Sequence, residues 1–183
     1  GTLTLSGGSA LVNSMAVTVN ASGTLKLASS EEIGTLAGVG AVNLQSNTLT
    51  LSGAVDAAYS GLMSGSGSLV KSGSGELTLS GVNTYSGATV VTAGTLTLSG
   101  GSALANAMAV TVNAGGTLKL ASSEEIATLA GAGAVHLQAN VLTLSGAGDS
   151  IYSGVMSGSG RLVKSGSGVL TLSGVNTLSG GAT

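Results

Sequence analysis

The sequence contains no cysteine, no phenylalanine and no tryptophan, and it has three tyrosines among 183 residues. Without cysteine there can be no disulfide framework and no thiol chemistry. Because large aromatic side chains fill much of a thick core, a two-sheet sandwich would be hard to pack from this composition. Leu, Val and Ala supply most of the apolar mass instead, and they suit a narrow, uniform interior.

Charged residues are also scarce. Five Lys and Arg residues face seven Asp and Glu residues, for a net charge of −2. Nucleic-acid binding needs clustered Lys and Arg, so we expect no nucleic-acid partner. A mean hydropathy of +0.54 argues against disorder. No apolar run approaches the ~18–20 residues of a membrane helix, and no signal-peptide core follows the first residue.

The chain repeats itself. Residues 1–90 align without gaps on residues 94–183 at an offset of 93, with about 72 of 90 positions identical. A long fixed period is the signature of a stacked repeat array. We therefore expect one solenoid segment, residues 1–183, made of two tandem repeats at 1–93 and 94–183. Because the chain starts and stops inside its own repeat, we also expect it to be part of a longer protein.

Short segments alternate between Leu or Val and a polar residue, which is the period of a strand with one buried and one wet face. Gly, Ser and Asn separate them, and Gly and Asn can take the positive φ that sharp corners need. These features predict an all-β parallel β-helix, whose coils would stack similar rungs, over a sandwich or barrel, whose antiparallel hairpins would not favour tandem near-copies. We expect about four coils of roughly 20–28 residues per repeat, eight in all. Residues 93 apart, such as Lys26 and Lys119, should then share a face.

A motif at residues 69–98 reads LVKSGSGELTLSGVNTYSGATVVTAGTLTL. It resembles the passenger-associated transport repeat of bacterial autotransporters, with matching residues at Lys71, Gly73, Gly75, Leu77, Leu79, Gly81, Asn83, Thr84, Tyr85, Gly87, Gly94, Thr95 and Leu96. A second copy begins at Leu162. It departs from the family pattern at Leu178, where the pattern has Tyr, and at Gly181, which resembles a one-residue shift. Asn83, Gly87, Asn176 and Gly180 would be the structural corners of the two copies.

The resemblance implies a right-handed parallel β-helix in a secreted passenger domain on the bacterial cell surface. Its only membrane connection would be an outer-membrane translocator barrel, which lies outside this sequence. Members with long arrays are often adhesins or aggregation factors, so the expected partners are further copies of the chain or host and bacterial surface ligands, including glycans. An extracellular filament or matrix subunit is the alternative, and a polysaccharide-active enzyme fits less well.

No catalytic, cofactor or metal site emerges from the sequence, and we expect no enzyme and no cofactor. Tyr59 and Tyr152 could stack on sugar rings, and Lys71, Arg161 and Lys164 could contact an anionic polysaccharide. These five are the candidate surface contacts.

The remaining ionisable residues favour plain structural interpretations. The pairs Glu31-Glu32 and Glu124-Glu125 predict solvated corners, and the single histidine, His136, predicts an exposed strand position because no matched acid or further ligand accompanies it. The methionines repeat between the copies and are expected to fill the interior, at Met15, Met63, Met108 and Met156.

Overall fold

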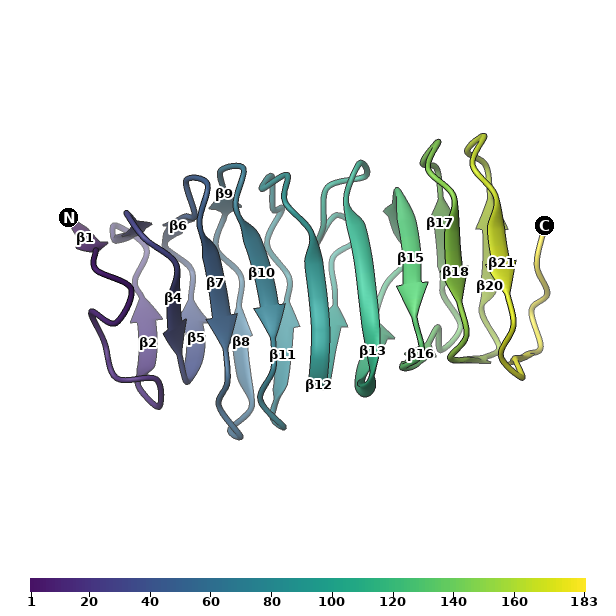
Figure 1. The fold of residues 1–183 in the computed structure, drawn as a ribbon, viewed down its shortest axis with the longest axis horizontal. Helices are drawn as coiled ribbons and strands as arrows, with labels where there is room; N and C mark the ends of the chain where they lie inside the picture. The colour runs from purple at the N-terminus through teal and green to yellow at the C-terminus, as the bar shows by residue number, and fades with distance from the viewer.

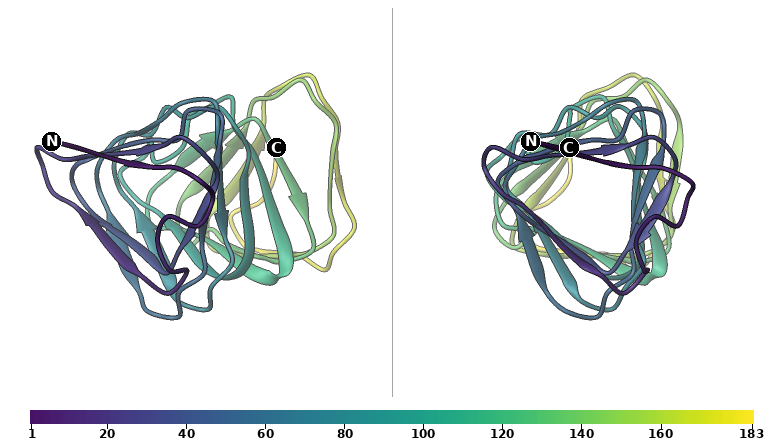
Figure 2. Two further views of the ribbon diagram at one scale, coloured as in Figure 1. Left: turned by 60° about the vertical axis from the view of Figure 1, so that its left-hand side comes forward. Right: turned by 90° about the vertical axis from the view of Figure 1, so that its left-hand side faces the viewer.

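The computed structural model describes residues 1–183 as a rod of parallel strands with no helix (Figure 1). Seen end-on, the coils superpose as a rounded triangle around one central core (Figure 2). The core is a single cluster of 35 buried apolar residues. The predicted all-β parallel β-helix is therefore confirmed.

Three stacks of strands form the three faces of the rod, which we name X, Y and Z in chain order. The Z face runs without a break, with the strands β2 (Ala16–Val19), β5 (Thr35–Gly38), β8 (Ala57–Tyr59), β11 (Glu76–Leu79), the second halves of β12 (Thr89–Leu98) and β13 (Ala109–Leu120), β16 (Ala134–His136), β19 (Val155–Gly158) and β22 (Thr177–Leu178).

The Y face is equally continuous, with the strands β4 (Glu31–Ile33), β7 (Thr48–Leu51), β10 (Ser68–Lys71), the first halves of β12 and β13, β15 (Thr128–Gly131), β18 (Ser150–Tyr152) and β21 (Leu170–Leu172). Both β12 and β13 bend from the Y face onto the Z face. Since β12 crosses residue 93, the boundary between the sequence repeats is not a structural boundary.

The X face is interrupted. Its first stack is β1 (Thr2–Leu5), β3 (Thr24–Leu27), β6 (Ala41–Asn43) and β9 (Met63–Ser64), and its second is β14 (Glu124–Ile126), β17 (Val141–Leu144) and β20 (Arg161–Lys164). Residues 83–86 and 103–105 occupy this face between the two stacks without forming strands.

The rod has about nine coils, where the sequence predicted eight. Paired residues on the X face show why, because Thr2 pairs with Thr24 and Thr24 pairs with Ala41, steps of 22 and 17 residues. Coils near 20 residues do not divide the 93-residue repeat evenly. From β1 on the X face the chain makes four full coils and returns to the X face at residues 83–86. It then passes along the Y face at residues 89–91 and reaches the Z face at residues 95–98, which are the repeat equivalent of β1.

The expectation that residues 93 apart share a face is consequently wrong. Lys26 pairs with Asn43 on the X face, whereas Lys119 pairs with His136 on the Z face. The second repeat is turned by one face about the rod axis relative to the first.

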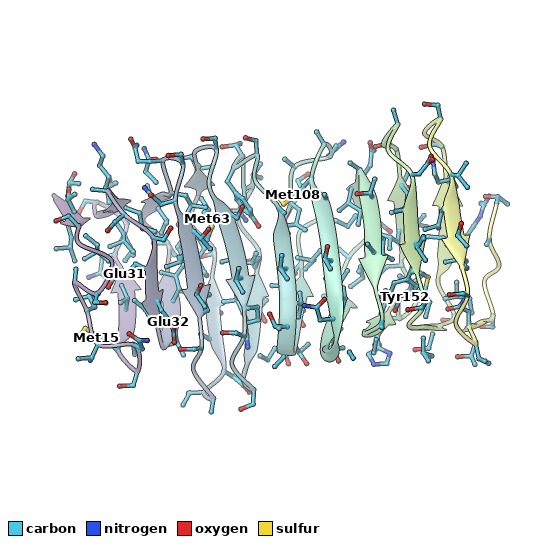
Figure 3. All side chains as sticks on the ribbon, viewed as in Figure 1. Met15, Glu31, Glu32, Met63, Met108 and Tyr152 are labelled. Carbon is cyan, nitrogen blue, oxygen red and sulfur yellow. The ribbon has the colours of Figure 1, made fainter.

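Most, but not all, of the expected interior residues are buried. Met63, Met108 and Met156 are in the core, while Met15 is 39% exposed (Figure 3). Met15 is the last residue of a segment of the first coil, residues 6–15, that contains no strand. The assignment of Met15 to the interior is therefore wrong.

Candidate functional site

Two of the candidate sugar-stacking residues are inside the rod. Tyr59 and Tyr152 have no exposed surface. The Tyr59 hydroxyl donates to the carbonyl oxygen of Gly40, one coil earlier, at 2.8 Å, and Tyr152 does the same to Gly133 at 2.7 Å. Burial raises the pKa of Tyr152 to about 12 and raises that of Tyr59 further. Both predicted surface contacts are wrong, because these rings fill the core and their hydroxyls bind the backbone at a corner.

The lysine of the first repeat motif is also buried. Lys71 points inward between Leu51 and Val91 of the adjacent coils, and its Nζ donates to the carbonyl oxygen of Gly73 at the corner that follows. Burial lowers the pKa of Lys71, and the nearby Asp56 carboxylate opposes that shift. Lys71 is thus a corner brace and not a surface contact, and the prediction for it is wrong.

The other two basic candidates lie closer to solvent. Arg161 is exposed, and its guanidinium donates to the Thr183 hydroxyl at 2.7 Å. Lys164 is half-buried, and its Nζ reaches the carbonyl oxygen of Gly166 at 2.6 Å, as Lys71 reaches Gly73. Arg161 therefore presents most of its side chain to solvent and Lys164 presents part of it, and a ligand contact at either residue stays a prediction.

One carboxylate of each glutamate pair is buried, against the expectation of solvated corners. Glu31 and Glu124 are 3% and 4% exposed. Their neighbours Glu32 and Glu125 are half-buried and face outward on the same strands, and Figure 3 labels the pair Glu31 and Glu32. The Glu124 carboxylate accepts the backbone N–H groups of Leu104 at 2.8 Å and Ala103 at 3.2 Å. Burial raises the pKa of Glu124, and these two hydrogen bonds oppose the rise.

The buried carboxylates replace missing strands. Residues 103–105 form no strand on the X face, so their N–H groups have no ladder partner in β14. Glu124 supplies the acceptors instead. In the first repeat Glu31 accepts from Leu11 N–H at 2.8 Å, again beside a segment without a strand, and its second oxygen has no partner. Each carboxylate fastens an irregular segment to the next coil.

Asn83 makes the matching connection between residues 103–105 and the coil that precedes them. Its side-chain oxygen accepts from Met63 N–H at 2.7 Å, and its Nδ2 donates to the carbonyl oxygens of Ala103 at 2.7 Å and Gly81 at 3.2 Å. One buried amide therefore links three successive coils. Asn176 repeats the contacts with Met156 N–H and the Gly174 carbonyl.

Two of the four predicted corner residues, Gly87 and Gly180, lie at corners, whereas Asn83 and Asn176 lie on the X and Z faces opposite Met63 and Met156, so the corner prediction is wrong for both asparagines. The positive φ that the sequence suggested for such positions is not found at any of the four. Gly87 is needed because a Cβ there would lie 2.3 Å from the carbonyl oxygen of Gly67, and Gly180 stands in the same relation to Gly160. The two asparagines act through their hydrogen bonds. The close approach of neighbouring coils thus requires the two glycines, and hydrogen bonds between coils require the two asparagines. None of the four positions needs a positive φ.

A further polar chain beside Asn83 was not anticipated. The hydroxyl of Tyr85 and that of Thr89 are 2.6 Å apart, and Thr89 donates to the sulfur of Met108 at 2.8 Å. All three side chains are buried. The two-residue period of the strands could have predicted the inward charged residues described above. Lys71 is two residues from Leu69, and Glu124 is two residues from Ile126, so each points to the same side of its strand as a buried apolar residue.

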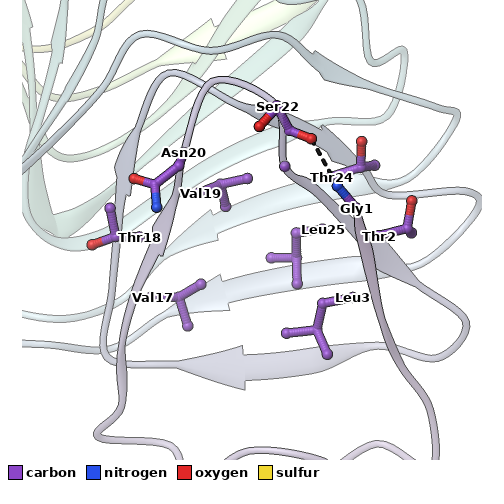
Figure 4. Close-up of a pocket in the computed structure, with 11 residues that line it drawn as sticks. Gly1, Thr2, Leu3, Val17, Thr18, Val19, Asn20, Ser22, Thr24 and Leu25 are labelled. Atoms are coloured by element: carbon purple, nitrogen blue, oxygen red, sulfur yellow. Dashed lines mark hydrogen bonds between the residues drawn. The ribbon is translucent and has the colours of Figure 1, made fainter.

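The exterior offers only shallow hollows. One, of about 470 Å³, lies at the first coil between β1, β2 and β3 (Figure 4). Leu3 and Val17, which line it, are packed only against the following coil. Another is lined by His136 and Ser157, whose Nδ1 and Oγ are 2.7 Å apart. That hollow contains no carboxylate, so no group is present to orient the imidazole for nucleophilic catalysis.

Two strips of exposed apolar side chains stand out on the exterior. On the X face Ala41, Leu62 and Val82 stack in consecutive coils, with Leu62 45% and Val82 65% exposed. On the Z face the equivalent stack is Ala134, Val155 and Val175, with Val155 47% and Val175 81% exposed. We call these the X strip and the Z strip.

The interior polar groups are thus occupied in joining coils, and the exterior is left for contact with other molecules. No three His, Asp or Glu side chains converge as metal ligands would, and no helix in the structure could cross a bilayer. The model of the passenger-associated-transport-repeat family matches residues 69–98 and 162–183. No curated protein and no solved structure matches the chain.

Proposed function

We propose that this chain, an autotransporter passenger-type parallel β-helix with two passenger-associated-transport repeats, is a non-catalytic stalk segment that mediates adhesion or cell–cell self-association. Repeats of this family imply a secreted or surface-exposed protein. The proposal concerns what the rod does at that surface.

The observation that carries the proposal is the use of the buried polar groups. Glu124, Asn83 and Lys71 all bond to backbone atoms of their own or adjacent coils. An enzyme of this fold would gather several of its Asp, Lys or Arg residues in a solvent-accessible groove. Here the charged side chains that are buried bond to the backbone and stabilise the stacked coils, which suits a load-bearing stalk.

The outer faces suit repeated weak contacts. Half-exposed polar side chains line up along the rod axis, as in the row Lys26, Asn43 and Ser64. Each contact of such a row with another surface would be weak, but many in parallel on one cell become strong. Further copies of the chain, host or bacterial surface ligands and glycans are the proposed partners.

The test is to display the 183-residue chain on a bacterium that does not aggregate, and to follow settling of the culture. Cells carrying the same anchor with the Leu79→Asp variant are the control, because that change disrupts the rod while the anchor and every other residue of the chain stay the same. We expect only the intact rod to accelerate settling or to bind immobilised host glycans. Display confirmed by antibody, with neither effect, contradicts the proposal.

A filament or matrix subunit is the second candidate, and electron microscopy of the purified chain separates the two. Single short rods are expected for a stalk segment, whereas long fibres built by end-to-end contacts are expected for a filament subunit.

A further inference from the structure

Residues 99–108, which cross the X face without forming a strand, are attached to the rod differently from the rest of the chain. Backbone hydrogen bonds anchor only their two ends, at Ser99 to the preceding coil and at Met108 to the following one, with N···O distances of 2.9 and 2.8 Å. Between these ends, no backbone group of residues 100–107 bonds to the backbone of another coil. We call residues 99–108 the strap.

Side chains of the neighbouring coils hold the strap in place of a backbone ladder. The Ser122 hydroxyl accepts a hydrogen bond from Gly101 N–H at 2.9 Å. Glu124 and Asn83 supply the other bonds, one from each side, as described above. Only three of the ten side chains of the strap are buried, those of Ala103, Leu104 and Met108. A segment with few buried apolar contacts and no backbone ladder has a low free energy of local opening.

The remainder of the same coil is held firmly on both sides. Its strand β13 pairs with β12 of the preceding coil, from Val110 on the Y face to Leu120 on the Z face. It also pairs with β15 and β16 of the following coil. None of these ladders includes a strap residue. The strap can therefore leave the X face while the coils stay stacked through the other two faces.

The first repeat contains the same segment with the same attachments. Residues 6–15 read SGGSALVNSM, and the strap reads SGGSALANAM. Ser29 and Glu31 accept hydrogen bonds from backbone N–H groups of residues 6–15, both at 2.8 Å. They are the repeat equivalents of Ser122 and Glu124. A segment fastened by side chains of the next coil is therefore a feature of the repeat, although its two copies lie on different faces.

We propose that the strap is a local opening unit, in which residues 99–108 leave the X face and return to it while the Y and Z ladders of the same coil stay paired. The opening is independent of what the rod binds at a surface. Its consequence is that the buried polar chain of Tyr85, Thr89 and Met108 becomes accessible to small solutes without unfolding of the rod.

The methionines are internal probes of this motion. Hydrogen peroxide transfers one oxygen atom to an accessible thioether sulfur, which becomes a sulfoxide while water is released. Met108 ends the strap, whereas Met63 and Met156 are as deeply buried but lie in the strands β9 and β19. Met15 is 39% exposed and reports the unhindered rate.

The test is to treat the purified, folded chain with hydrogen peroxide and to follow each methionine by mass spectrometry of its peptide. We expect Met15 to be oxidised first, Met108 next, and Met63 and Met156 last. Met108 oxidised as slowly as Met63 and Met156 would overturn the proposal, because the strap would then open only with the whole rod.

The variant Glu124→Ala removes the acceptor of two strap N–H groups. It should raise the oxidation rate of Met108 about tenfold or more and leave the rates of Met63 and Met156 unchanged. Equal acceleration of all three buried methionines would contradict the proposal, since that pattern reports opening of the entire rod. Circular dichroism establishes that the variant is folded.

A milder pair of variants decides the matter if Glu124→Ala does not fold. Ser122→Ala removes the acceptor of Gly101 N–H, and it should accelerate oxidation of Met108 less than Glu124→Ala does. Ser123→Ala is the matched control, because the Ser123 hydroxyl accepts from the following coil at Val141 N–H and bonds to no strap residue. Met108 should react in this control as in wild type, and equal rates in the two serine variants would refute the role of the strap.

Discussion

Lys26 and Lys119 occupy the same position in two nearly identical sequence repeats, yet they project from different faces of the β-helix. The offset of 93 residues carries the chain through four coils and two faces of the next. Identical local sequence therefore meets different neighbours in the two copies. Glu31 and Glu124 illustrate this, since Glu31 lies on the Y face and Glu124 on the X face.

The leucine stack is the first target for mutation. Leu79 is fully buried between Tyr59 and Leu98 of the adjacent coils, while Thr78 on the same strand faces outward. We expect Leu79→Asp to lower the free energy of unfolding by about 3–5 kcal/mol, because it buries an unpaired charge. Thr78→Asp should change it by less than about 0.5 kcal/mol. Urea denaturation of both variants measures this, and equal effects would contradict the inward assignment of Leu79.

The glutamate pair at residues 124–125 provides a matched comparison on one strand. Glu124→Ala leaves the N–H groups of Ala103 and Leu104 without acceptors in a buried segment. We expect a loss of about 1–3 kcal/mol for each orphaned donor. Glu125→Ala removes an outward side chain and should have little effect. Hydrogen exchange at residues 103 and 104 should accelerate in the first variant only; protected amides there would refute the role assigned to Glu124.

Glu124 should also give the rod a specific dependence on pH. Because burial raises its pKa, the folded chain binds the proton more tightly than the unfolded chain, whose ordinary value is 4.5. The penalty of burying the charge is fully present above the folded-state pKa and disappears as the pH falls below 4.5. Wild type should therefore gain stability relative to Glu124→Gln as the pH falls from neutral towards 4.5. Denaturant midpoints of the two proteins across this range measure the difference, and a difference that is constant or of opposite sign would disprove it.

The glycines that separate coils predict a steric limit. A Cβ at Gly61 would lie 1.9 Å from the carbonyl oxygen of Gly40, whereas a Cβ at Gly148 would meet nothing closer than 3.7 Å. Gly61→Ala should destabilise the rod by about 1–3 kcal/mol through overpacking, and Gly148→Ala should be neutral or slightly stabilising. Thermal melts of the two variants decide the matter. If Gly61→Ala melted with wild type, the coils would have to be more loosely stacked than in this structure.

Much of the fold was predictable from local sequence. The alternation in segments such as residues 2–5 and 77–79 gave strands, and the near-identity of two 93-residue copies favoured stacked coils over hairpins. The residues of the motif at 69–98 pointed to the same architecture. The inward lysine and glutamates were missed because charged side chains were expected in water, although their position in the period of two placed them beside Leu69 and Ile126.

The sequence by itself determined the rod, because Leu and Val at every second residue can be buried only if each coil covers the next. Only the tertiary structure decided which face each residue occupies and which polar side chains turn inward. The physical reason is that coil length depends on the number of residues each corner absorbs, and small differences add up over several coils. Likewise, Glu124 and Asn83 are inward because the neighbouring segment lacks a strand, and its unpaired backbone groups need a partner from another coil.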